Sequence, residues 1–213
     1  RQMCIRDRRE VQQLEGGELQ KIRLGRFGVH GDGSCAYHTI CTAFNVEDYV
    51  HQTDERQKQI AYKFRCSFGD KLSKEKLGDV LKKVKGGAKE GTTVLSIQEN
   101  LCDPKVWADE TALRIVGDAL NTNLIFLDME KNSMYCGMHH EDSLQTKSHR
   151  SLPNTVVVLW VSHSHFEPMA HILKVGDKVA SVKVLLEPAK SEADARLVAS
   201  LMARYKTQCK LKR

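Results

Sequence analysis

Hydrophobic residues recur at helical spacing in the first part of the chain and again at its end. From Ala36 they recur every three or four residues through Ile40 and Phe44, which predicts a helix. The same spacing predicts helices over 55–68, 71–85, about 109–120 and 191–210. The 71–85 segment is rich in lysine, so we expect an amphipathic surface helix whose charges are solvated.

Signals for strands gather later in the chain. They are LIFLD at 124–128, the segment near MYCGM at 134–138, TVVVLWV at 155–161 and the AHILKV segment after Pro168. TVVVLWV is apolar on both faces, which is typical of a central strand. Because helices come first and strands follow, the pattern predicts an α+β fold with a sheet packed against helices. We expect loops around 86–91 and over 139–154.

The pattern divides the chain into one domain and two flanking segments. We expect a lead-in over 1–20, a domain over 21–175 and an extension over 176–213 that carries an amphipathic basic helix. The opening RQMCIRDRRE is charged and lacks the periodicity of a core element, so we exclude it from the fold prediction. Our hypothesis is that these residues are not native to the protein. No segment has the apolar length that crosses a bilayer, and no apolar block near the start is typical of a signal peptide.

Composition narrows the class of protein. The 213 residues include 7 cysteines, an odd number without CxxC spacing, which indicates reduced thiols in a cytosol-like compartment. The net charge of +6 is mildly basic. Aromatic residues make up only 6% of the chain and do not alternate with basic ones, so a nucleic-acid-binding protein is a weak alternative.

The stretch GDGSCAYHTI at 31–40 places Cys35 at the start of the first predicted helix. There its sulfur would face unpaired N–H groups and the positive end of the helix dipole, which stabilise a thiolate. The glycines before it allow a turn that directs the N–H groups of 32–34 into one small space, as an oxyanion requires. A glycine turn followed by an inert buried cysteine explains this stretch equally well.

A general base is expected far from Cys35 in sequence, where TVVVLWV runs into SHSHFEPM. His163, His165 and Glu167 share one parity, so the carboxylate of Glu167 can lean toward the imidazole of His165. Pro168 keeps the backbone of Glu167 extended. A carboxylate on one ring nitrogen leaves the other for a thiol. His163 or His171 taken singly is explained as a surface histidine, and we interpret His38, one turn after Cys35, as structural.

Three blocks together resemble the ovarian-tumour (OTU) family of cysteine peptidases. They are Asp32-Gly-Ser-Cys35, WADETALRIVGDAL followed by NTNLIFLD, and HFEP, and the resemblance spans about 27–173. It implies a papain-like OTU fold with a central, mostly antiparallel sheet packed between helices. By position, Cys35 is similar to the nucleophile and His165 to the general base. Glu167 stands where the family orients the histidine with Asp or Asn, and Asp32 matches the acidic residue that shapes the oxyanion loop (Asp32, Gly33, Ser34 and Cys35) or serves as a third catalytic member.

The resemblance also implies an activity and partners. It implies a deubiquitinase that hydrolyses the isopeptide bond after the C-terminal glycine of ubiquitin, or of a ubiquitin-like modifier, with no cofactor. We expect a monomer that binds ubiquitin or polyubiquitin chains, no membrane, and a cytoplasmic location, which for our hypothesis of a viral source means the host cytosol.

Alternatives to this prediction remain. A ubiquitin-binding module without activity and a basic nucleic-acid-binding protein are the two other classes. The CGMHHED segment at 136–142 suggests a zinc cluster, but structural zinc sites need two separated ligand pairs, so we predict no metal site.

Overall fold

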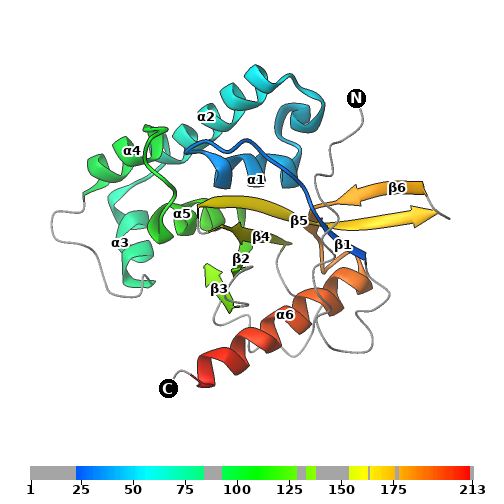
Figure 1. The fold of residues 1–213 in the computed structure, drawn as a ribbon. Helices are drawn as coiled ribbons and strands as arrows, with labels where there is room; N and C mark the ends of the chain where they lie inside the picture. The colour runs from blue at the N-terminus through cyan, green and yellow to red at the C-terminus, as the bar shows by residue number, and fades with distance from the viewer. Residues whose placement is uncertain are drawn as a thin grey trace.

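A sheet crosses the middle of the molecule, with α6 on one side and the other helices on the opposite side (Figure 1). The computed structural model describes residues 23–83, 93–128, 133–137, 154–162, 164–175 and 178–211. The helices are α1 (Cys35–Phe44), α2 (Asp54–Asp70), α3 (Lys74–Lys83), α4 (Val94–Cys102), α5 (Glu110–Leu120) and α6 (Glu192–Leu211), with a 3-10 helix η2 (Val46–His51). The strands are β1 (Arg23–Arg26), β2 (Thr122–Asp128), β3 (Ser133–Gly137), β4 (Asn154–Val161), β5 (His165–Val175), β6 (Lys178–Lys183) and β7 (Leu185–Leu186).

The sheet has the order β1-β5-β4-β2-β3, while β6 pairs with β5 and β7 with β4. Among the described strands β2 and β4 run parallel, and the other pairs are antiparallel. The predicted α+β class and the mostly antiparallel sheet are therefore confirmed. The prediction that 155–161 forms a central strand is also confirmed, because β4 lies between β5 and β2.

Alternation along the central strands builds two hydrophobic cores. Leu124 and Phe126 of β2, with Val156 and Val158 of β4, pack in one core with α1–α5. The residues that alternate with these along β2 and β4 point to the opposite face of the sheet, where they pack with Leu197, Val198 and Leu201 of α6. Successive side chains of a strand point to opposite faces, so a strand covered on both faces is apolar throughout. This double coverage explains the unbroken apolar TVVVLWV.

Helix α1 lies at the centre of the larger core, and Cys35 through Thr42 are all buried. The Oγ1 of Thr39 donates to the carbonyl of Phe166 across 3.3 Å, which fixes α1 against β5. Because Thr39 lies one turn after Cys35 on the same face of the helix, this contact brings the start of α1 toward the start of β5. Helix and strand therefore meet at the ends where the predicted nucleophile and base lie.

The structure differs from the sequence predictions in several segments. Arg23–Arg26 forms β1, paired with β5, although no strand was predicted for this segment. Helix α4 was not predicted; it begins with a capping box in which Thr93 and Ser96 exchange hydrogen bonds. The lysine-rich helix begins at Lys74 rather than residue 71.

The segment after residue 175 is built into the same sheet. We expected 176–213 as an extension, and the structure pairs its β6 with β5 and packs its α6 on β2 and β4. The described helices include none long and apolar enough to span a membrane. The expectations for 1–20, for 86–91 and for 139–153 lie outside the described residues.

Candidate active site

Cys35 is the first residue of α1 and is 6% exposed. The turn before it is closed by two hydrogen bonds to Asp32: the N–H of Ser34 donates to Oδ1 across 2.8 Å, and the N–H of Cys35 donates to the carbonyl across 3.2 Å. The predicted oxyanion loop is therefore an ordered turn. Two of its N–H groups already have partners within the loop, so an oxyanion has to compete with Asp32 for them.

Gly33 is required by the packing of this loop. A Cβ added there would lie 1.8 Å from the carbonyl oxygen of Pro104, in the segment that follows α4. No side chain fits at that distance, so any other residue displaces one of the two segments. The loop before Cys35 is thus seated directly on the chain between α4 and α5.

His165 is the first residue of β5 and lies opposite Val161 of β4. The parity argument treated the residues after Val161 as extended, whereas the chain turns there, with Ser162 at a φ of 52°. The N–H of Ser164 closes the turn on the carbonyl of Val161 across 3.2 Å. The shared parity of His165 and Glu167 holds all the same, because both belong to β5. Their Nε2 and Oε1 atoms are 3.4 Å apart.

Cys35 and His165 are brought into contact although they are far apart in sequence. Hydrogen bonds to Cys35 and to Glu167 raise the pKa of His165 from its ordinary value to about 9, against burial, which lowers it. Gly31 lines the same space, since a Cβ there would lie 3.9 Å from Nδ1 of His165. The imidazole therefore lies between the Cys35 thiol and the Glu167 carboxylate, which is the order of groups that a nucleophile, a base and an orienting acid require.

Glu167 is buried and has a second cationic neighbour. Arg26 of β1 places its Nε 2.6 Å from Oε2 of Glu167 in an ion pair, while Oε1 faces His165. Arg26 lies opposite Met169 in the pairing of β1 with β5. Arg26 was not among the predicted site residues, because no strand was predicted for its segment. The ion pair fixes the carboxylate, so Glu167 is held in place to orient His165.

Asp32 contacts a different histidine. Its Oδ2 lies 3.1 Å from Nε2 of His38, which is fully buried on α1, and Nδ1 of His38 bonds the hydroxyl of Tyr49. Burial lowers the pKa of His38, and the neighbouring Asp32 opposes this. One carboxylate oxygen of Asp32 thus bonds within the loop, and the other bonds the buried His38. These contacts favour the loop-shaping role for Asp32 over the orienting role.

The other residues that the sequence singled out lie only partly within the described chain. In the described part of the chain, no three His, Cys, Asp or Glu side chains are grouped so that they could hold a metal ion. The 138–142 part of the proposed zinc segment and His163 lie outside the described residues. Burial raises the pKa of the Cys41 thiol well above its usual range, so that cysteine is inert.

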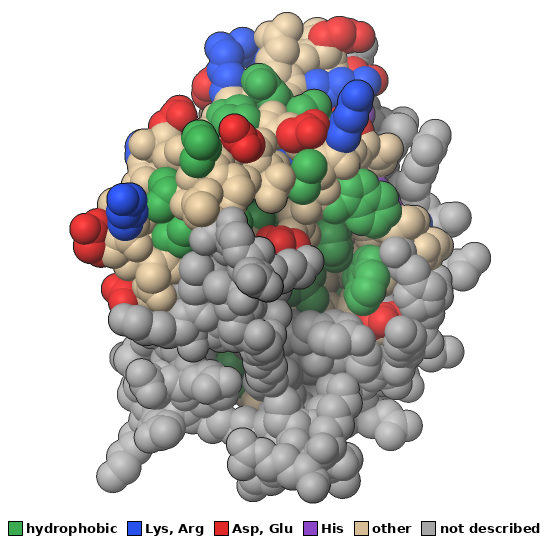
Figure 2. All heavy atoms as spheres, turned by 90° about the vertical axis from the view of Figure 1, so that its left-hand side faces the viewer, with side chains coloured by type: hydrophobic (Ala, Val, Ile, Leu, Met, Phe, Trp, Pro, Cys, Tyr) green, Lys and Arg blue, Asp and Glu red, His purple; other side chains and the backbone are tan. Residues whose placement is uncertain are grey.

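The face that carries α3 and α4 has mixed charge. Figure 2 shows acidic, basic and hydrophobic side chains interspersed over its described part. Nucleic-acid binding usually depends on a continuous basic patch that neutralises phosphates. The described residues of this face therefore form no continuous basic patch, and Lys74 and Lys76 of α3 are exposed.

Cys35 and His165 lie together on an α+β scaffold, and the chain is similar to several solved structures. A structure described as an ovarian tumor (OTU) domain in complex with ubiquitin aligns over 91% of this chain and 92% of its own, with 17% identity and a TM-score of 0.52. A Hazara virus OTU bound to ubiquitin aligns over 73% of this chain and 86% of its own, with 12% identity and a TM-score of 0.43. An OTU deubiquitinase from Wolbachia pipientis wMel bound to ubiquitin aligns over 70% and 96%, with 15% identity and a TM-score of 0.42.

The first of these likenesses establishes the fold: this chain has the fold of OTU domains. No family model matches the sequence, and no curated protein does. The fold that the short sequence blocks implied is therefore confirmed at the level of three-dimensional structure.

Proposed function

We propose that this protein is a cysteine-type deubiquitinase that hydrolyses the isopeptide bond after the C-terminal glycine of ubiquitin or of a ubiquitin-like modifier. The observation that carries the proposal is the contact of Cys35 with His165, whose other side faces Glu167. The OTU domain that shares this fold is described in complex with ubiquitin, which supports the choice of substrate. A binding module gains nothing from an activated thiol next to an oriented imidazolium.

The reaction is acyl transfer in two steps. The thiolate of Cys35 attacks the carbonyl carbon, and N–H groups of the loop formed by Asp32, Gly33, Ser34 and Cys35 stabilise the oxyanion. His165 then gives its proton to the leaving lysine amine, which leaves a thioester. In the second step His165 takes a proton from water, the hydroxide attacks the thioester, and the freed carboxylate leaves as the thiolate is restored.

Each neighbour of the pair has a part in this scheme. Glu167, fixed by Arg26, holds the imidazole so that its other nitrogen faces the sulfur. Asp32 keeps the turn before Cys35 closed through its bond to Ser34. No metal or cofactor enters any step.

Ubiquitin with an electrophilic C-terminus tests the proposal. We expect the wild-type protein to form one covalent adduct, and Cys35→Ala to form none. Cys66→Ala is the matched control, because Cys66 is another free cysteine, half-buried on α2, and this variant should label like the wild type. No adduct with the wild type, or equal labelling of Cys35→Ala, contradicts the assignment. Ubiquitin binding without labelling would identify a binding module instead.

A further inference from the structure

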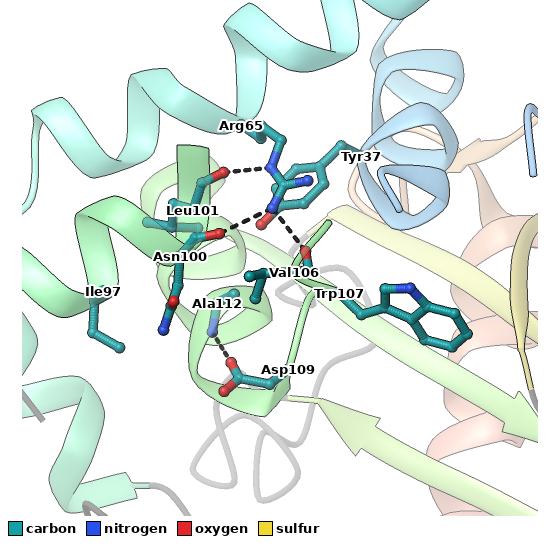
Figure 3. A pocket seen from close by; sticks show the side chains of 9 residues that line it. All are labelled: Tyr37, Arg65, Ile97, Asn100, Leu101, Val106, Trp107, Asp109 and Ala112. Atoms are coloured by element: carbon teal, nitrogen blue, oxygen red, sulfur yellow. Dashed lines mark hydrogen bonds between the residues drawn. The ribbon is translucent and has the colours of Figure 1, made fainter. Parts of the chain in front are cut away.

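A buried arginine lies directly beneath the loop that carries Cys35. Arg65 of α2 is 1% exposed, and its guanidinium stacks over the ring of Tyr37, 4.7 Å from the ring centre (Figure 3). A buried charge is tolerated only when its hydrogen bonds are satisfied. Arg65 meets this condition with oxygen acceptors alone, and its five hydrogen bonds use all five of its N–H donors.

The five acceptors lie on two segments that meet at Gly33. Three of the acceptors are carbonyl groups in the last turn of α4 or just after it. The last carbonyls of a helix lack helical partners, and the helix dipole favours a cation beside them. The three acceptors are the carbonyls of Leu101, Asn100 (3.0 Å) and Val106 (2.9 Å). The other two precede the nucleophile directly: Oγ of Ser34 at 3.0 Å and the carbonyl of Gly33 at 3.5 Å. Arg65 thus joins the loop before Cys35 to the segment on which Gly33 is packed.

The bond to Ser34 has a consequence for α1. Ser34 is the N-cap residue of α1, and a serine there ordinarily accepts a hydrogen bond from an N–H of the first turn. Here its hydroxyl accepts from Arg65 instead, and α1 has no side-chain cap. The positive end of the helix therefore carries no side-chain cap beside the sulfur of Cys35, where a thiolate and then an oxyanion would be stabilised.

We propose that Arg65 is a positioning residue of the active site, which holds the nucleophile loop and keeps the Ser34 hydroxyl from capping α1. This inference rests on the proposed peptidase function and deepens it. It assigns the shape of the oxyanion loop to a side chain of α2 that does not touch the substrate. The guanidinium fork is essential to this role, because an ammonium group cannot reach oxygens on both segments at once.

The test compares Arg65→Lys, Ser34→Ala and the double variant with the wild type. Arg56→Lys is the matched control, because Arg56 lies on the same helix, is partly exposed and pairs with Glu47 at the surface. Active sites are titrated with electrophilic ubiquitin, so kcat per titrated site is separated from loss of folded protein. The rate at which iodoacetamide alkylates Cys35 gives a second measurement that needs no ubiquitin.

We expect Arg65→Lys to lower kcat per titrated site by about tenfold or more, with KM within about twofold, because displaced groups lose much of their effect on the transition state. Ser34→Ala should lower kcat in the same direction by a smaller factor, and it disturbs folding little. The double variant should be no slower than Arg65→Lys, since both changes remove the same bond. Alkylation of Cys35 should slow in the same order, and Arg56→Lys should match the wild type.

Other outcomes contradict either this inference or the proposed peptidase function on which it rests. Wild-type kcat per site and wild-type alkylation in Arg65→Lys contradict the role of Arg65. If Arg65→Lys does not fold, wild-type values in Ser34→Ala contradict the hold of Arg65 on the nucleophile loop through Ser34. A double variant whose losses multiply shows that the two residues act independently and also contradicts it. A wild-type protein that forms no ubiquitin adduct refutes the proposed function, and the alkylation rates then decide alone whether Arg65 positions the thiol.

Discussion

Two histidines in this chain each lie beside a carboxylate, and their surroundings give them opposite properties. His38 is fully buried between Asp32 and Tyr49, and burial lowers its pKa. The side chain of His165 is 22% exposed, and hydrogen bonds to Cys35 and Glu167 raise its pKa to about 9. A carboxylate neighbour alone thus does not define a catalytic histidine. The difference comes from burial and from the thiol, which only His165 contacts.

The two pairs are linked through the loop before Cys35. The His38 pair holds Asp32, whose Oδ1 accepts from Ser34, and so supports the nucleophile from within the core. The His165 pair lies at the start of a strand, where the imidazole can exchange protons. In the proposed mechanism, the His38 pair maintains the fold of the loop and the His165 pair carries out the chemistry.

The largest expected effect comes from His165→Gln, which removes the base. Turnover of a fluorogenic ubiquitin substrate should fall on the order of 10⁴-fold, as in other enzymes that lose the histidine of a catalytic triad. The melting temperature should change little, because His165 is partly exposed. Turnover within tenfold of the wild type would show that His165 is not the base.

Glu167→Gln tests which carboxylate orients the base. The change keeps the shape and removes the charge, so we expect kcat to fall by about 100-fold while ubiquitin binding is maintained. Asp32→Asn is the comparison. The amide oxygen of the new side chain can still accept from the N–H of Ser34, so kcat should fall by less than tenfold. If Asp32→Asn is the slower variant, the orienting role belongs to Asp32.

The pH profile follows from the raised pKa of His165. Below about 9 the imidazole keeps the proton that the leaving amine needs, so kcat/KM should fall as the pH rises through about 9, approaching tenfold per pH unit. In Glu167→Gln this decline should begin at lower pH, because one group that raises the pKa is gone. Activity should also be lost at low pH, where the catalytic pair is fully protonated. An alkaline limit that is the same in both proteins argues against the contact with Glu167.

The smallest effect on turnover is expected for His38→Gln. Loss of buried hydrogen bonds should destabilise the protein by about 1–3 kcal/mol, which lowers the melting temperature by several degrees. The kcat per titrated site should stay within about tenfold of the wild type, since His38 acts through the loop. A loss as large as that of His165→Gln would place His38 in the chemistry and remove the distinction between the two histidines.

Local patterns were sufficient to predict much of the fold. The helical spacing from Ala36 predicted α1, and the glycines before Cys35 predicted the turn at its start. The apolar run at 155–161 predicted the central strand because both faces of β4 are covered. These features depend on residues adjacent in sequence, so the sequence alone records them.

Features that depend on distant segments were not predictable in the same way. Arg26 reaches Glu167 only because β1 pairs with β5, and the five acceptors of Arg65 come from separate segments. The turn between β4 and β5 also escaped prediction, since Ser162 adopts a left-handed conformation without the glycine or asparagine that usually marks one. Helix α4 is short: its 9 residues span fewer than three turns, so the helical pattern has little length in which to repeat.

The contact between Cys35 and His165 is the claim on which the account depends, and an NMR titration of the His165 ring tests it most directly. We expect a pKa near 9 in the wild-type protein and a clearly lower pKa in Cys35→Ala, because the thiol is the largest cause of the rise. The pKa of His38 should be the same in both proteins. A His165 pKa near its ordinary value, or one that Cys35→Ala leaves unchanged, would show that the two side chains do not meet.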